Sequence, residues 1–228
     1  MVADYSQVEL RILAHIAGER AMVEAFAAGE DIHRSTAAAV LGVAPELVTA
    51  EQRRAAKTIN FGLIYGMSAF GLAKNLGISN QEAERFIAAY FARYGGIQRY
   101  VQETLARAEA EGKVETLWGR VRLLPELKHP SYAVRENAKR MAINARIQGS
   151  AADLLKLAMI GVDRRLRAEA PAAGLLLTVH DELVLETPEA DAGRVAELVR
   201  AEMESAARLD VPLVVETGTG KTWGSAKS

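Results

Sequence analysis

Residues 175–186 have the sequence L-L-L-T-V-H-D-E-L-V-L-E, in which two apolar runs flank the polar residues His180, Asp181 and Glu182. Apolar runs interrupted by so few polar residues predict two strands, Leu175–Val179 and Leu183–Glu186, paired as a tight hairpin with a rigid tip. This hairpin decides the fold class, because most of the remaining chain has helical periodicity. We therefore expect an α+β protein.

Two further segments on either side of this hairpin predict strands, Val2–Asp4 and Leu213–Thr217. The first leads into a helix opened by the S-x-x-E capping box of Ser6 and Glu9, and residues 114–124 predict a short hairpin with Gly119 near its turn. Capping residues, glycine stops and apolar spacing predict the other helices: residues 19–28, 31–41, Thr49 to about Tyr65, three stretches up to about 110, 132–169 with a break or bend near Gly149, and 189–209. The sequence thus predicts antiparallel strands with a helical subdomain inserted between them.

The composition of the 228 residues, half of them apolar and a quarter charged, excludes a disordered chain. The longest mostly apolar stretch, Ala170–Val179, is about half the ~20 residues that a membrane span needs, so we expect a soluble, cytoplasmic protein without a membrane partner. With no Cys, a metal would have to be held by carboxylate, imidazole or carbonyl groups, which favours hard cations.

Charge is unevenly distributed although the formal net charge is only −1. Residues 113–146 contain 8 Lys and Arg against 3 Asp and Glu, whereas residues 181–216 contain 3 against 10. A basic face, which suits a polyanion, can therefore coexist with an acidic pole.

Acidic residues stand at the ends of two predicted strands, Asp4 on one and the pair Asp181 and Glu182 on the other. If folding brings them together, they could share two divalent ions ~3.5 to 4 Å apart, because cations make closely spaced carboxylates tolerable. An acid at a hairpin tip is more often a turn former, so the spacing alone does not decide.

A second pattern lies in the helix after Thr49, where Arg53, Lys57, Phe61 and Tyr65 recur every four residues and form one stripe. The cations could bind a triphosphate while an aromatic ring further along stacks on a base. A solvated basic turn followed by packed rings would give the same spacing. Ala56, Ile59 and Leu63 supply an opposite, apolar face.

Arg140, Asn144 and Gln148 form a third stripe, which is polar and lies within the basic segment. All three side chains can donate to the acceptors that every base pair presents in the minor groove, but an ordinary exposed helix face would look similar. His33 is either a phosphate donor or a capping or core histidine. The tail Gly218–Thr222, G-T-G-K-T, ends like a phosphate-binding loop but lacks the required glycine at Val215 and a following helix of useful length.

Together, D-Y-S-Q-V-E-L at Asp4, R-R-A-A-K-T-I-N-F-G-L-I-Y-G at Arg53 and V-H-D-E at Val179 resemble, in order and spacing, the polymerase motifs of family A DNA polymerases, the bacterial DNA polymerase I type. D-I-H at Asp31 and Q-G-S-A-A-D at Gln148 resemble family segments too. The resemblance covers essentially the whole chain. It implies a DNA-directed DNA polymerase of replication and repair, with primer-template DNA, dNTP and two Mg²⁺ as partners.

The resemblance implies a role for each residue of these motifs. Asp4 and Asp181, with the carbonyl of Tyr5, resemble the metal-binding catalytic group, and Glu182 resembles the acid near the primer end. Arg53, Lys57 and His33 are similar to the triphosphate contacts, Lys57 also being a candidate proton donor. The remaining implied roles are base stacking by Phe61, a template-side position for Tyr65, a nucleotide contact by Gln7, a steric gate against ribose formed by Glu9 with Tyr65, and primer-template contacts by Arg140, Asn144, Gln148 and His180.

The resemblance also implies a partial right-handed polymerase fold, with fingers over about 19–111 and palm and duplex-contacting helices over about 1–18 and 112–228. The family's thumb precedes the first motif, where this sequence has only Met1, Val2 and Ala3, so we expect impaired extension by the fragment. The alternative is a catalytically silent nucleotide- or DNA-binding module. A two-metal nuclease fits less well, since it has no use for the cation-and-aromatic stripe. The oligomeric state does not follow from the sequence.

Overall fold

The computed structural model describes residues 1–227, which form two compact units. One contains Met1–Ile12 together with the chain from Ser150 onward, and the other contains Leu13–Gly149. The first is built around an antiparallel sheet and the second is mainly helical, so the α+β prediction is confirmed. The helical unit includes the whole predicted segment 19–111 and, in addition, residues 13–18 and 112–149.

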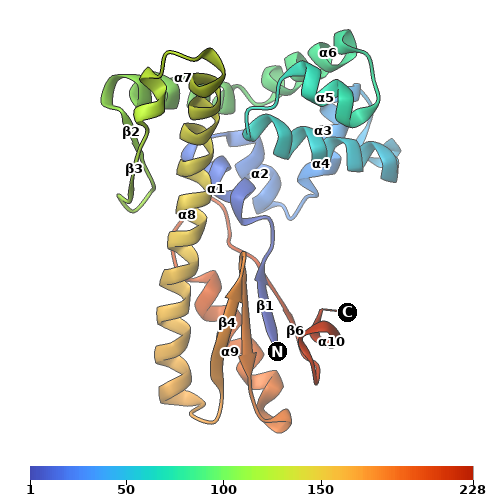
Figure 1. Cartoon of the computed structure of the whole chain (residues 1–228). Coiled ribbons are helices and arrows are strands. Elements are labelled where there is room, and N and C mark those ends of the chain that lie inside the picture. The colour runs from blue at the N-terminus through green and yellow to red at the C-terminus, as the bar shows by residue number, and fades with distance from the viewer. Residues whose placement is uncertain (228) are drawn as a thin grey trace. The chain divides into compact units, whose positions relative to one another are not determined.

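The sheet has the strand order β4-β5-β1-β6 and is antiparallel throughout (Figure 1). Its strands are β1 (Val2–Tyr5), β4 (Gly174–Val179), β5 (Glu182–Glu186) and β6 (Val215–Gly218). Helix α9 (Ala192–Glu204) packs against β1 and β6 through buried apolar side chains such as Val195 and Val199, and the short α10 (Trp223–Ala226) follows β6. The sheet therefore joins the beginning of the chain to its end.

Strand β4 lies at an edge of this sheet, and two of its leucines face solvent. Leu176 is 58% exposed and Leu177 is 44% exposed. On the neighbouring strand β5, in contrast, Leu183, Val184 and Leu185 are buried. The apolar side chains of the hairpin are thus buried along β5 but only partly buried along β4.

The helical unit follows the predicted order of helices closely. Its elements are α1 (Val8–Ile16, which begins in the other unit), α2 (Arg20–Ala27), α3 (Ile32–Leu41), α4 (Ala50–Ile64), α5 (Ala69–Leu76), α6 (Asn80–Arg93), α7 (Gly95–Glu111), β2 (Lys113–Glu115), β3 (Val121–Leu123) and the first part of α8 (Tyr132–Glu169), with 3-10 turns at Pro45–Leu47 and Pro125–Lys128. The Thr49–Gln52 capping box and the left-handed stop at Gly42 are confirmed, with φ 67° at Gly42. These local signals define α3 and α4, which pack against each other.

Helix α8 continues through Gly149, so the first of the two possibilities expected there, a break, is wrong. A Cβ at this position would lie 2.6 Å from Cγ2 of Thr116, which follows β2. Glycine is needed because the hairpin approaches the helix closely, not because the helix ends. Two other boundaries differ: α9 ends at Glu204 after a 3-10 turn at Glu189–Asp191, and β6 begins at Val215.

No helix within residues 1–227 combines the length and apolar character that crossing a membrane requires.

Candidate active site

The antiparallel sheet brings the predicted acidic strand ends together. Asp4 on β1 pairs with Glu182 on β5, and the backbone N–H of Tyr5 donates to the carbonyl of Asp181 at 3.4 Å. Val179 pairs with Glu182, so His180 and Asp181 form a two-residue turn in which His180 has φ 55°. A turn this short leaves the hairpin tip little freedom and fixes Asp181 beside Asp4.

The carboxyl of Asp4 is strongly perturbed. Burial, followed by the negative charges of Asp181 and Glu182, raises the pKa of Asp4 to about 6, against an opposing effect of Lys227. A side-chain hydrogen bond with Asp181 acts in the same direction as burial. Oδ1 of Asp4 is nevertheless buried without a hydrogen-bond partner among the described residues.

These properties fit a site for a hard divalent cation, which would neutralise the pair and provide the missing partner for Oδ1. No group of three or more His, Cys, Asp or Glu side chains within residues 1–227 has the arrangement of a metal site. The side chains that could hold such an ion are the carboxylates of Asp4 and Asp181, which lie beside each other at the strand ends.

Glu182 differs from both aspartates because its carboxylate is already engaged. Oε1 accepts a hydrogen bond of 2.6 Å from the indole nitrogen of Trp223, and Oε2 lies 2.9 Å from Nζ of Lys227. The Glu182 side chain is only 3% exposed. Its orientation is thus set by two residues of the C-terminal segment, for which the sequence patterns gave no role.

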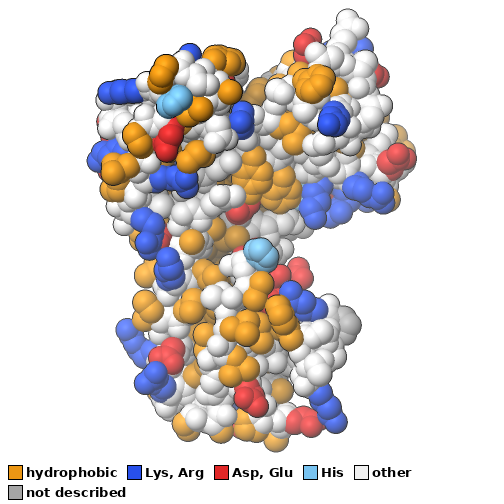
Figure 2. Space-filling model, viewed as in Figure 1, with side chains coloured by type: hydrophobic (Ala, Val, Ile, Leu, Met, Phe, Trp, Pro, Cys, Tyr) orange, Lys and Arg blue, Asp and Glu red, His pale blue; other side chains and the backbone are white. Residues whose placement is uncertain are grey.

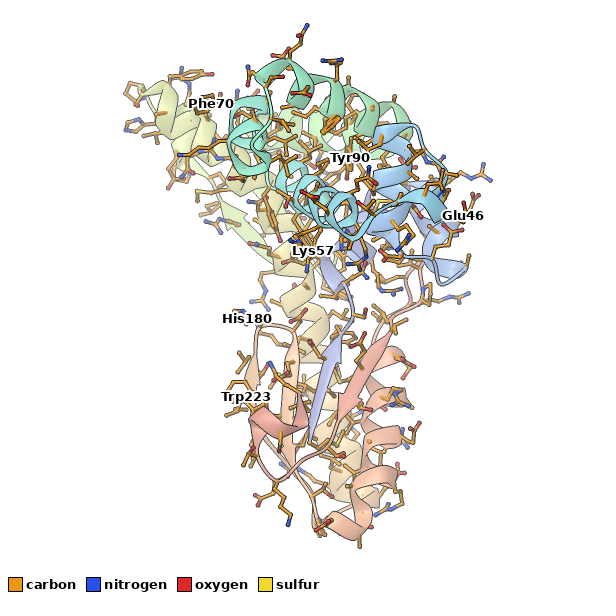
Figure 3. All side chains as sticks on the ribbon, turned by 90° about the vertical axis from the view of Figure 1, so that its right-hand side faces the viewer. Glu46, Lys57, Phe70, Tyr90, His180 and Trp223 are labelled. Atoms are coloured by element: carbon orange, nitrogen blue, oxygen red, sulfur yellow. The ribbon has the colours of Figure 1, made fainter. Side chains whose placement is uncertain are left out.

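Other predicted residues of this unit lie near the strand ends. The hydroxyl of Tyr5 donates to the carbonyl of Met203 at 2.6 Å. Gln7 has φ 54° and a buried Oε1 with no partner in the described part of the chain, and Glu9 lies half-buried on α1. His180 is exposed at the hairpin tip, where Figure 3 shows it.

In the helical unit, Asp31 links α3 to the basic end of α4. Its Oδ1 caps α3 by accepting from the backbone N–H groups of His33 at 3.0 Å and Arg34 at 3.2 Å, while Oδ2 binds Nε of Arg53. Burial opposes ionisation of Asp31, but the hydrogen bonds from Arg53 and Arg34 lower its pKa overall. Arg53 is thereby held in place with its side chain still 41% exposed.

Lys57 lies one turn further along α4 and is exposed, with no ion pair to any residue in 1–227 (Figure 3). Figure 2 shows that basic side chains gather over α3 and α4. The apolar residues predicted on the opposite face, Ala56, Ile59 and Leu63, are all buried. The predicted stripe is therefore an accessible face rather than part of the core.

His33 belongs to a buried polar network between α3, α4 and the start of α7. Its Nδ1 lies 2.9 Å from Nδ2 of Asn60, Asn60 Oδ1 lies 3.1 Å from Thr36 Oγ1, and Thr36 Oγ1 lies 3.1 Å from the hydroxyl of Tyr94. Burial lowers the pKa of His33 to about 4, with Asp31 opposing and Arg53 and Lys57 assisting the shift. The imidazole is consequently neutral at pH 7.

Aromatic rings continue this surface along α4. The ring centroids of His33 and Phe61 are 5.9 Å apart, and those of Phe61 and Tyr65 are 6.4 Å apart with an interplanar angle of 29°. Both Phe61 and Tyr65 are half-buried. A planar ligand could stack on rings that are partly open in this way.

The third predicted stripe lies along α8. Arg140 and Gln148 are exposed, and Arg140 Nη2 donates to Asn137 Oδ1 at 3.3 Å. Asn144 is half-buried, and its Oδ1 has no hydrogen-bond partner in the described chain. The predicted residues therefore form an acidic cluster in one unit and basic, aromatic and polar faces in the other.

Several residues that shape these clusters were missed by sequence reasoning. Asn60, Thr36 and Tyr94 support His33, while Trp223 and Lys227 hold Glu182. A polar Asn on the inward, apolar face of a predicted helix was the available signal for the first group. The second group had no local signal, because its contacts cross 41 positions or more of sequence.

A family model described as DNA polymerase family A matches residues 1–225. DNA polymerase I of Pseudomonas aeruginosa is 52% identical over 226 residues, which are 99% of this chain and 25% of that protein. DNA polymerase I of Deinococcus radiodurans is 52% identical over 227 residues, 100% of this chain and 24% of that protein. The thermostable DNA polymerase I of Thermus filiformis is 49% identical over 227 residues, 100% of this chain and 27% of that protein.

Among solved structures, the POL domain of Pol1 from M. smegmatis in complex with DNA primer-template and dNTP matches with a TM-score of 0.95 at 44% identity. The match covers 100% of this chain and 40% of that chain. The chain spans about a quarter of the length of the curated relatives it matches.

Proposed function

This chain belongs to DNA polymerase family A, and from that membership we propose that it carries the nucleotidyl-transfer site of a template-directed DNA polymerase. Primer-template DNA and dNTP are the proposed partners, as they are bound by the M. smegmatis relative. The observation that supports this most directly is the raised pKa of Asp4, a half-buried carboxyl beside the negative charges of Asp181 and Glu182, which a bound cation would neutralise.

The acidic cluster is proposed to hold two Mg²⁺ through Asp4 and Asp181, with the carbonyl of Tyr5 as a further ligand. Bound there, the ions would activate the primer 3′-hydroxyl and neutralise the departing pyrophosphate. Asp4 would then act as an ionised ligand, because cation binding lowers the pKa that burial and the neighbouring acids raise. Glu182 contributes near the primer end through its fixed carboxylate.

The basic and aromatic face of α4 is proposed to bind the dNTP. Arg53, oriented by Asp31, offers a planar fork to phosphate oxygens, and Lys57 offers a mobile ammonium that can also protonate pyrophosphate. His33 contacts phosphate as a neutral side chain. Phe61 stacks on the base. The further nucleotide contacts are Gln7, the steric gate Glu9, and Tyr65 at the template side.

Arg140, Asn144 and Gln148 on α8, together with His180, are proposed to contact the primer-template. Donors on one helix face suit the minor-groove acceptors common to all base pairs, which permits binding without sequence readout. We propose fingers over about 19–111 and palm and duplex contacts over about 1–18 and 112–228. Since these residues match 40% of the M. smegmatis chain, we expect them alone to bind Mg²⁺-dNTP better than they extend DNA.

The proposal is tested by dNTP binding and primer extension with the 228-residue chain. Asp181→Asn should abolish Mg²⁺-dependent extension and weaken Mg²⁺-dependent dNTP binding, whereas Glu186→Gln, which removes an exposed acid from the other end of β5, should change neither. If the affinity for dNTP is changed neither by Mg²⁺ nor by substitution of Asp4, the chain is instead a catalytically silent binding module. Shortening of the primer would indicate a nuclease.

A further inference from the structure

The C-terminal segment that resembles part of a phosphate-binding loop has a different structural role. Residues 218–227, here called the C-terminal clasp, fold back so closely that side chains do not fit at two positions. A Cβ on Gly218 would lie 1.9 Å from the carbonyl oxygen of Ala226, and one on Gly220 would lie 2.4 Å from Oγ of Ser225. The glycines therefore serve the return of the chain rather than a phosphate.

Local capping forms the short helix α10 within the clasp. Ser225 N donates to Thr222 Oγ1 at 3.2 Å and Thr222 N donates to Ser225 Oγ at 3.1 Å, which completes a capping box. Ala226 is buried against Val2 of β1 and Val184 of β5. The clasp is thus attached to the two strands that carry Asp4 and Glu182.

Trp223 of α10 and Lys227, which follows the helix, both bind one carboxylate. The indole N–H of Trp223 and the ammonium of Lys227 bind different oxygens of Glu182, and Lys227 Nζ lies 5.2 Å from the centroid of the Trp223 ring. Figure 3 shows Trp223 on the same unit as the His180 hairpin tip. Glu182 is therefore held at both oxygens, while Oδ1 of Asp4 keeps no partner in the described chain.

We propose that the C-terminal clasp is a positioning element, in which Trp223 and Lys227 keep the Glu182 carboxylate apart from the Asp4–Asp181 pair and leave that pair as the cation ligands. The inference rests on the proposed function. Lys227 has a second effect, since its charge acts on Asp4 and Asp181 as well as on Glu182. The ammonium of Lys227 therefore competes electrostatically with a divalent ion for the negative charges of Asp4, Asp181 and Glu182.

Loss of Lys227 should therefore affect ion binding and catalysis in opposite directions. Without the ammonium, the acidic cluster attracts divalent ions more strongly, and Oε2 of Glu182, which Lys227 held, can join the ligand set. Extension should nevertheless slow, because the ion then sits in altered geometry. A residue that merely stabilised the fold would weaken both together, so the opposite signs identify a positioning role.

The ion-binding test titrates Mn²⁺ into the 228-residue chain and follows free Mn²⁺ by electron paramagnetic resonance. Lys227→Met should tighten binding on the order of fivefold by removing a unit charge close to the site. Lys227→Arg should stay within about twofold of the parent chain because it restores the charge. Lys221→Met is the matched control, since Lys221 lies in the same clasp, is exposed and has no ion pair in residues 1–227.

A second readout is tryptophan emission, with Trp118→Phe as background so that Trp223 is the remaining indole. Mn²⁺ should quench Trp223, and quenching should saturate at lower Mn²⁺ in Lys227→Met. Unchanged or weaker Mn²⁺ binding in Lys227→Met, or an equal effect in Lys221→Met, would overturn the inference. If the parent chain shows no saturable binding that Asp4→Asn removes, the proposed function itself fails, and the two failures are distinguishable.

Discussion

Removing the charge of Asp4 should stabilise the metal-free protein. The substitution is Asp4→Asn, measured in a chelator at pH 7.5. The pKa of Asp4 rises from 3.8 to about 6 on folding, so the native state binds this proton more tightly than the unfolded state does. The favourable contribution is present below the unfolded pKa and is lost as pH rises through the native pKa. At pH 7.5 the native state therefore carries an unfavourable carboxylate.

The magnitude follows from the size of the shift. About 1.4 kcal/mol per pH unit would give about 3 kcal/mol, and discounting for the partial exposure of Asp4 leaves about 1–2 kcal/mol. For a chain of this size, that corresponds to a rise in melting temperature of about 3–6 °C. The gain should shrink toward pH 4.5, where the native carboxyl is already neutral and the unfolded one is partly protonated.

Thermal and urea unfolding at the two pH values would check this, with Glu186→Gln as the control for loss of a surface charge. Added Mg²⁺ should reverse the order, because the parent chain gains binding energy that Asp4→Asn lacks. A destabilised Asp4→Asn protein at pH 7.5, or an identical gain at both pH values, would refute the electrostatic account of the cluster.

Three further results are expected. His33→Gln should remove the rise in stability of the parent chain between about pH 4 and 6.5, where the unfolded histidine binds a proton that the native one excludes; urea midpoints across this range would show it. Asp31→Ala should cost the helical unit about 1–2 kcal/mol through the lost cap of α3, whereas Asp31→Asn, which keeps an acceptor, should cost less in urea unfolding. Gly149→Ala should destabilise the β2–β3 hairpin by pressing on Thr116 Cγ2, and Thr116→Ser in the same chain should restore stability; equal melting temperatures for single and double variants would contradict this contact.

Features fixed within a few residues could be predicted from the sequence. The capping box at Thr49 and the glycine stop at Gly42 are formed as expected, because a cap satisfies backbone groups only three or four positions away. The burial of Ile59 and Leu63 follows likewise from helical spacing.

Features set by distant contacts could not be predicted. Gly149 was expected to interrupt α8 because its reason, the approach of Thr116, lies elsewhere in the chain. Helix α9 was predicted too long, since Ser205 bonds back to the carbonyls of Ala201 and Glu202 and ends the helix. Thr222 had no interpretation until the structure showed it capping α10.

The edge strand β4 has a practical consequence for handling this chain. Within residues 1–227, β5 is the strand that pairs with β4, whose other side is an edge of the sheet with the outward-facing leucines Leu176 and Leu177. An edge of this kind can template the addition of a strand from a second molecule. Concentrated samples should therefore self-associate through sheet extension, and light scattering would detect it. A lysine in place of Leu176 should suppress this association while leaving the buried side chains of β5 untouched.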